Sequence, residues 1–85
     1  MQSDQKQLNM YFKFLKDMGY KYSKHAMGFY FDRALKRFSV VQIGDIYHAY
    51  YYKREDGKYV LQEQILGRIL LLHCIQWIFI RAKGN

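Results

Sequence analysis

The stretch that decides the predicted fold runs from Ile46 to Leu61 and reads IYHAYYYKREDGKYVL. Its first part, as far as Arg54, is rich in tyrosine and other residues that favour strands. Asp56-Gly57 is a strong signal for a two-residue turn, because a type I′ turn requires positive φ at both positions. The stretch therefore predicts a β-hairpin closed by Asp56-Gly57.

The register of this hairpin follows from its loop. The facing pairs are Glu55 with Lys58, Arg54 with Tyr59, Lys53 with Val60, and Tyr52 with Leu61. Facing residues share one side of a sheet, so one side carries Tyr50, Tyr52, Tyr59 and Leu61. The other side carries Tyr47, Tyr51, Lys53 and Val60. We expect the first side to face the core.

Upstream of the hairpin, the chain begins with a predicted helix from about Asp4 to Met18. Apolar residues recur there at helical spacing, at Leu8, Tyr11, Phe12, Leu15 and Met18. Ser3 is placed to cap this helix, and Gly19 is placed to end it in a left-handed conformation.

A second helix is predicted from about Lys24 to Phe38, because Met27, Tyr30, Phe31, Ala34, Leu35 and Phe38 lie on one helical face. The alternative is a strand over Gly28–Phe31, which β-propensity favours. The sequence also allows a short third strand over Val40–Ile43, directly before the hairpin. The rival interpretation is a helix from Ser39, whose first residues fit a capping box.

The last predicted element is a helix from Leu61 or Gln62 to Arg81. Its second half is apolar on nearly all sides, and such a helix must be buried. About 20 residues span roughly 30 Å, which two short helices and a hairpin would hardly cover. We therefore expect a homodimer with this helix at the interface. The predicted interface residues are Ile69, Leu72, Ile75, Gln76 and Phe79. The alternative is a monomer with this helix at its centre.

These elements predict an α+β fold in a single domain over residues 1–85: two N-terminal helices, a tyrosine-rich hairpin with a possible third strand, and a long apolar C-terminal helix. In architecture alone, this order resembles a winged-helix module with an added dimerisation helix. A winged helix places three helices before its hairpin, whereas two are predicted here, and no motif in the residues identifies a family.

Composition narrows the class of protein. Hydrophobic residues make up 51% of the chain and aromatic residues 19%, so the chain is not a disordered tail. The formal net charge is +7, which attracts anions such as nucleic acid, an acidic protein face or an anionic membrane. The lone cysteine Cys74 and the lack of a signal-like N-terminus predict a cytoplasmic location, and the apolar runs are too short for integral membrane association.

Enzyme chemistry has little support in the sequence. The histidines His25, His48 and His73 stand far apart. His73 and Cys74 are neighbours, but adjacent residues on a helix point about 100° apart. The acids form no dyad, no glycine-rich phosphate loop occurs, and no cluster has metal-ligand spacing. We expect no catalytic residue, metal or cofactor.

Basic and aromatic residues are the stronger indication. The predicted nucleic-acid contacts are Lys21, Lys24, Arg33, Lys36, Arg37, Lys53, Arg54 and Lys58. Lysine and arginine near a polyanion release counterions and so give affinity. The predicted stacking residues are Tyr22, Tyr47 and Tyr51, since exposed rings stack on unpaired bases.

The resulting expectation is a small, basic, non-enzymatic nucleic-acid-binding module, dimeric through its C-terminal helix. DNA and RNA, and single and double strands, are equally compatible with the sequence. The alternative is a small inhibitor or adaptor of the phage or mobile-element type, which uses its positive charge on an acidic surface of a host protein. A peripheral membrane protein is disfavoured, because the distal half of the last helix lacks a basic polar face.

Overall fold

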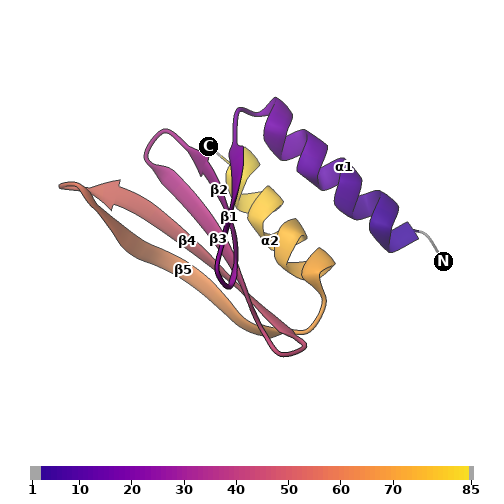
Figure 1. The fold of residues 1–85 in the computed structure, drawn as a ribbon. Coiled ribbons are helices and arrows are strands. Elements are labelled where there is room, and N and C mark those ends of the chain that lie inside the picture. Colours follow the sequence, from indigo (N-terminus) through magenta and orange to yellow (C-terminus); the bar gives the residue numbers. More distant parts are fainter. Residues whose placement is uncertain (1–2, 85) are drawn as a thin grey trace.

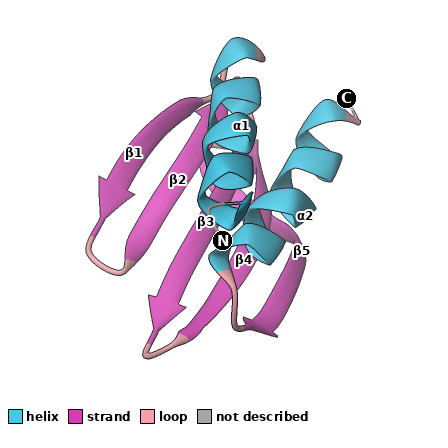
Figure 2. Ribbon diagram, turned by 90° about the vertical axis from the view of Figure 1, so that its right-hand side faces the viewer, coloured by secondary structure: helices cyan, strands magenta, loops and turns pink. Residues whose placement is uncertain are grey.

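Five consecutive strands lie between two helices in the computed structural model, which describes residues 3–84. The elements are α1 (Ser3–Asp17), β1 (Lys21–His25), β2 (Gly28–Arg33), β3 (Lys36–Ile43), β4 (Ile46–Glu55), β5 (Lys58–Arg68) and α2 (Leu71–Lys83). The strands form one antiparallel sheet whose spatial order follows the chain. Both helices lie against the same face of this sheet, and the other face is uncovered (Figures 1 and 2).

The core lies between the sheet and the helices. Alternation along the strands points one set of side chains toward the helices. The buried members of that set are Phe29, Phe31, Phe38, Val40 and Ala49. Leu15 of α1 packs against them, together with Cys74, Ile75, Ile78 and Ala82 of α2. α2 lies over β4 and β5, and α1 lies over the first strands of the sheet (Figure 2).

The prediction of the first helix is confirmed. It covers Ser3–Asp17, and Gly19 follows with a φ of +94°, the conformation expected of a residue that ends a helix. The side chain of Ser3, predicted to cap this helix, lies outside the part that the structure describes.

The hairpin and its register are also confirmed. The φ angles of Asp56 and Gly57 are +52° and +77°, and Glu55, Arg54, Lys53 and Tyr52 face the predicted partners. The orientation of the hairpin was predicted wrongly. Ala49 is fully buried beneath the helices, and its alternation places Tyr47 and Tyr51 on the covered face. Tyr50, Tyr52 and Tyr59 therefore lie on the uncovered face.

The predicted helix over Lys24–Phe38 is wrong, and the alternative strand is right. Residues 28–33 form β2, and residues 36–43 form β3. Phe29 and Phe31 both enter the core, which is the period-two alternation of a strand, and β2 pairs with β3 along its whole length. Gly28 allows this pairing, because a Cβ at this position would lie 1.7 Å from the carbonyl oxygen of Val40 on the neighbouring strand. The predicted short strand Val40–Ile43 is the second half of β3, so the rival helix from Ser39 is wrong.

The long apolar C-terminal helix is also wrong. β5 continues to Arg68, and α2 starts at Leu71 with 13 residues. The strand is bulged: Tyr52 faces Leu61 while Tyr51 faces Glu63, so Gln62 is an extra residue. A bulge of this kind moves the following side chains to the opposite face. Ile65 thereby joins the core beside Ala49, although period-two counting from Leu61 would place it on the other face.

These corrections remove the winged-helix resemblance and the reason for expecting a dimer. The hairpin is part of a five-stranded sheet, and α2 is short enough for its apolar side to be buried within one chain. Within residues 3–84, no helix is long and apolar enough to cross a membrane.

Candidate functional site

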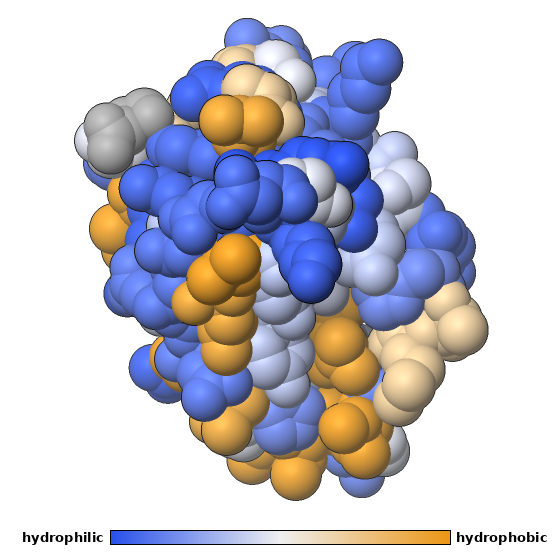
Figure 3. Space-filling view, turned by 90° about the vertical axis from the view of Figure 1, so that its left-hand side faces the viewer, coloured by the Kyte–Doolittle hydropathy of each residue, from blue (hydrophilic) through white to orange (hydrophobic). Residues whose placement is uncertain are grey.

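The uncovered face of the sheet gathers tyrosine from three different strands. Tyr30 belongs to β2, Tyr50 and Tyr52 to β4, and Tyr59 to β5; all four are partly exposed. Tyr30 and Tyr50 flank Ser39, a small buried residue of β3. In Figure 3, which shows the side opposite to the helices, surface of intermediate hydropathy runs through the middle of this face, with hydrophilic surface mostly above it and hydrophobic surface mostly below it.

Arg37 lies among these rings and is held rigidly. Its Nε and Nη2 atoms each donate a hydrogen bond to the carboxylate of Asp32, at 2.8 Å. Its guanidinium carbon lies 3.9 Å from the centroid of Tyr30 and 4.2 Å from that of Tyr59. The hydrogen bonds that Arg37 donates to Asp32 are the main cause that raises the pKa of Arg37. Arg37 thus fixes the spacing of two rings from distant strands.

The remaining rings extend this arrangement along β4. The rings of Tyr50 and Tyr52 are stacked with centroids 6.2 Å apart, and Tyr59 meets Tyr52 edge-on at 6.5 Å. On β1, next to Tyr30, the ring centroid of His25 lies 4.3 Å from that of Tyr30. Burial raises the pKa of Tyr52, with smaller contributions from Tyr50 and Tyr30, so its phenol is neutral at physiological pH.

Most of the predicted cationic contacts meet at one end of the sheet. The β2–β3 turn, the β4–β5 turn and the start of β1 lie there, which brings together Lys21, Arg33, Lys36, Arg37, Lys53, Arg54 and Lys58. Lys24 is the exception and lies toward the opposite end. Arg37 and Arg54 project on the uncovered face with the tyrosines. Arg54 is exposed, and its guanidinium carbon lies 5.2 Å from the ring of Tyr59.

Three of these cations form a row on the helix-covered face. Lys36 is the cross-strand partner of both Arg33 and Lys53. Burial is the first cause that lowers the pKa of Lys36, followed by the charges of Arg33 and Lys53. Arg33 also has a structural role, because it donates a 2.8 Å hydrogen bond to the carbonyl of Met18 and lies over the ring of Tyr20.

The predicted stacking residues lie on the covered side of the sheet. Tyr51 stacks on Phe38 with centroids 4.7 Å apart, and Tyr47 packs against the core. Tyr22 is 51% exposed on β1 and contacts Phe12 of α1. Sequence reasoning therefore missed the tyrosines of the uncovered face. The available signal was that their side of β4 also carries His48 and Arg54, whereas the opposite side carries Ala49.

The predicted dimer residues are divided between surface and interior. Leu72 and Ile75 are buried inside the chain itself. Gln76 and Phe79 are partly buried, and Ile69 is 65% exposed just before α2. Only part of the predicted set is therefore accessible to a second chain.

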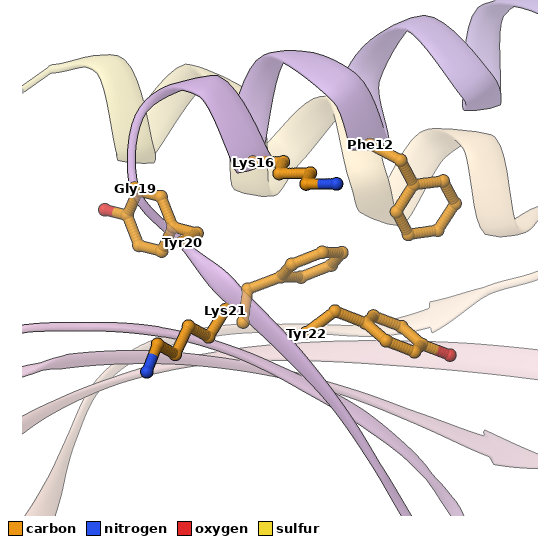
Figure 4. Close-up of a pocket in the computed structure, with 7 residues that line it drawn as sticks. Phe12, Lys16, Gly19, Tyr20, Lys21 and Tyr22 are labelled. Atoms are coloured by element: carbon orange, nitrogen blue, oxygen red, sulfur yellow. The ribbon is translucent and has the colours of Figure 1, made fainter.

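A separate groove lies between α1 and β1, with a volume of about 750 Å³ (Figure 4). Its lining residues are Phe12, Lys16, Gly19, Tyr20, Lys21, Tyr22 and Phe31. The amine of Lys16 lies over the hollow, whereas the hydroxyl of Tyr20 points away from it (Figure 4).

The described residues offer little for covalent or metal chemistry. In residues 3–84, no three His, Cys, Asp or Glu side chains lie where they would hold a metal ion together. Cys74 is fully buried, and burial raises the pKa of its thiol to about 11. The reactive thiolate is therefore scarce at neutral pH.

Comparisons with known proteins identify no relative. No protein-family model matches the chain, and neither a curated protein nor a solved structure is significantly similar to it.

Proposed function

We propose that this chain binds single-stranded nucleic acid on the uncovered face of its sheet. The observation that carries the proposal is the group of four tyrosines, two of which contact the guanidinium of Arg37, on a face that neither helix covers. Such a face combines π surfaces for bases with cations for phosphates, which is how sequence-tolerant single-strand binders work.

The tyrosines supply the contacts to bases. Each base has a π face, so stacking on Tyr50, Tyr52 or Tyr59 requires no particular sequence. Their neighbours already restrain these rings, through the stacked pair Tyr50–Tyr52 and through Arg37 beneath Tyr59. A ring that is ordered before binding loses less conformational entropy when a base arrives.

Charge supplies the contacts to phosphates. The charge of Arg37 is compensated by Asp32, so Arg37 serves mainly to position rings. Arg54 is exposed and forms no ion pair within residues 3–84. It stands beside Tyr59 at the basic end of the sheet. We assign Arg54 to phosphate binding and the net charge of +7 to long-range attraction.

The shape of the face favours single strands over duplexes. The major groove of DNA is about 12 Å wide and admits a helix or a two-stranded ribbon. The tyrosines spread over β2, β4 and β5, which is wider than a two-stranded ribbon. Bases also need to be unpaired before a ring can stack on them.

The test is fluorescence anisotropy with a mixed-sequence 12-mer, presented as single-stranded DNA, single-stranded RNA and duplex, at two salt concentrations. We expect both single strands to bind more tightly than the duplex, and binding to weaken as salt rises. Tyr52→Ala is expected to weaken single-strand binding by about tenfold, the effect of losing one stacked base.

Tyr22→Ala is the matched control, because Tyr22 is an exposed tyrosine on the opposite face of the sheet. It should leave single-strand affinity unchanged. Equal affinity of the Tyr52→Ala variant and the original chain would contradict the proposal, as would tighter binding of the duplex. Circular dichroism of each variant establishes that the fold is retained.

The alternative function, an inhibitor or adaptor that binds an acidic face of a host protein, draws on the same surface. Tyrosine and arginine are enriched at the energetic centres of protein interfaces, and Tyr59 and Arg54 are adjacent here. This alternative replaces the first if no oligonucleotide binds at low salt and a stoichiometric protein partner is lost on Tyr52→Ala substitution.

A further inference from the structure

The groove between α1 and β1 lies on the helix-covered side of the sheet, away from the tyrosine face. Phe12 and Lys16 reach it from α1, Tyr22 reaches it from β1, and Phe31 reaches it from β2. Its volume of about 750 Å³ lies within the range of small-molecule sites, roughly 300–1,000 Å³. Aromatic rings form most of its floor (Figure 4).

We propose that this groove binds the acyl chain of a single-chain anionic amphiphile, with the ammonium of Lys16 held against its carboxylate or phosphate headgroup. The proposal does not depend on the nucleic-acid function, because the two sites lie on opposite faces of the sheet.

The packing of the rings favours a flexible chain over a flat aromatic ligand. The centroids of Phe12 and Phe31 are 5.5 Å apart, those of Tyr22 and Phe31 are 5.7 Å apart, and those of Phe12 and Tyr22 are 6.1 Å apart. A planar ring inserted between two others requires about 7 Å, twice the usual contact distance between stacked atoms. The three rings therefore leave no room for a flat ring between them, and a ligand must lie along their surface.

The charges around the groove favour an anion. Among the described residues that line it, Lys16 and Lys21 are the two ionisable side chains other than tyrosine, and none is a carboxylate. On the same helix Lys13 is paired with Asp17 at 2.8 Å, whereas Lys16 forms no ion pair among residues 3–84. The amine of Lys16 lies over the hollow, while Lys21 extends away from it (Figure 4).

The test is a titration of ¹⁵N-labelled protein with octanoate, decanoate and laurate, each below its micelle-forming concentration. We expect amide shifts concentrated at residues 16–22, and affinity that rises by up to about fourfold per added methylene, as for apolar surface that leaves water. Decyltrimethylammonium, the cationic counterpart, should bind at least tenfold more weakly than decanoate. Shifts spread over the whole chain, or equal binding of the cation, would overturn the proposal.

Lys16→Glu should weaken laurate binding at least tenfold, while Lys13→Glu, with the same change of charge on the same helix, should leave it within twofold. Tyr22→Ser tests the apolar floor at an exposed position and should shorten the chain length at which affinity stops rising. If both charge variants behave alike, the assignment of Lys16 is wrong.

Two further experiments distinguish the possible types of lipid ligand, and distinguish this site from the nucleic-acid site. Vesicles of phosphatidylglycerol, compared with phosphatidylcholine, test a two-chain bilayer lipid as the occupant. We expect laurate to bind more tightly than either vesicle; Lys16-dependent binding to phosphatidylglycerol vesicles without binding to laurate would overturn the single-chain ligand. A single-stranded 12-mer should not displace laurate. Displacement would place both ligands on one site and overturn the proposal, whatever the fate of the nucleic-acid function.

Discussion

Arg37 shows how a cation can order a surface without presenting its charge. Both of its hydrogen bonds go to Asp32, and its flat guanidinium contacts Tyr30 and Tyr59. The planar, bidentate geometry of arginine is required for this, because a lysine ammonium neither forks nor stacks in this way. The role of Arg37 therefore differs from that of Arg54, although both are cations of the same face.

Two substitutions separate these roles. Arg37→Lys keeps the charge but loses the bidentate pair, so we expect single-strand affinity to fall about tenfold while the slope of log affinity against log salt stays the same. Arg54→Gln removes a phosphate contact, so the slope should decrease by about 1. The salt dependence of binding measures both effects, and identical slopes in the two variants would contradict the division of roles.

Gly28 is the residue on which the pairing of β2 with β3 depends most directly. Because a Cβ would lie 1.7 Å from the carbonyl oxygen of Val40, Gly28→Ala must push the two strands apart. We expect a loss of about 3 kcal/mol in the free energy of unfolding, measured with urea.

Gly57→Ala is the control, since no atom of residues 3–84 lies within 4 Å of its added Cβ and only its φ of +77° is unfavourable for alanine. Its cost should be about 1 kcal/mol. A smaller loss at Gly28 than at Gly57 would mean that the strands adjust without cost.

Burial raises the pKa of several thiol and phenol groups, and we therefore expect the chain to lose stability at alkaline pH. The pKa of Cys74 rises from 9.0 to about 11 on burial, and burial also raises the pKa values of Tyr20, Tyr51 and Tyr52. A raised pKa stabilises the fold below the unfolded value and loses that contribution as pH passes through the folded value. The thiol contribution should therefore be complete below pH 9 and disappear between pH 9 and 11.

Urea unfolding at half-unit intervals of pH measures this loss, to which each proton contributes up to about 1.4 kcal/mol per pH unit. Cys74→Ala should reduce the slope between pH 9 and 11 by up to one proton. Parallel curves for the two proteins would show that the thiol does not titrate with unfolding.

At the scale of elements, the sequence predicts those whose signals are local. α1 has a regular apolar stripe and a terminal glycine, and the hairpin has Asp56-Gly57, so both were predicted to within a residue or two. The turn between β2 and β3 lacks such a signal: Ala34 adopts a φ of +52° without being glycine. Without a turn signal there, the helical spacing of apolar residues over 24–38 predicts a helix.

β5 was mistaken for a helix because of its bulge. Leu61, Ile65 and Leu66 stand at helical spacing, and the extra residue Gln62 removes the alternation that would indicate a strand. Pairing with β4 decides the outcome, because residues 58–68 form an antiparallel ladder with β4 that satisfies backbone hydrogen-bonding groups of both strands. The tyrosines of the candidate site were missed for a related reason. The cations around the site were predicted as contacts, but the side of β4 that carries Tyr50 and Tyr52 was predicted to face the core.

Deletion of Gln62 tests the function of the bulge. Without it, Ile65 must leave the core or the register of β5 must shift, so we expect a loss of at least about 2 kcal/mol, the value of burying one large aliphatic side chain. Gln62→Ala keeps the bulge and changes only an exposed side chain, so its effect should stay within about 0.5 kcal/mol. Similar stability of the deletion and the substitution in urea would show that the bulge is dispensable.

At the scale of the molecule, most of the predicted cations lie at one end of the sheet, and a group of exposed apolar side chains lies at the other. The β2–β3 and β4–β5 turns carry most of the predicted cationic contacts. The other end exposes large apolar side chains, namely Met27, Ile43, Ile46, Leu66 and Ile69. A pair of chains joined through the apolar ends would keep the basic ends far apart, so this is where the predicted dimer is best tested.

If two chains join through this apolar end, Ile69→Glu should lower the mass measured by light scattering from two chains to one, because the substitution places a charge in the contact. Ile69 is the most exposed of the predicted interface residues, whereas Leu72 and Ile75 are core residues whose substitution would unfold the chain. Ile80→Glu, on the outer side of α2, should leave the mass unchanged. A single-chain mass for the original protein at all concentrations would contradict the dimer.

The order of the strands has a consequence for the speed at which the chain folds. Because each strand pairs only with its neighbours in sequence, the sheet assembles by closing one short loop after another, and such local topologies fold quickly, on the order of milliseconds. α2 is synthesised after the whole sheet, yet it supplies the cover for Phe38 and Val40. During synthesis, the part of the sheet that α2 covers in the folded chain therefore remains without that cover until α2 has left the ribosome.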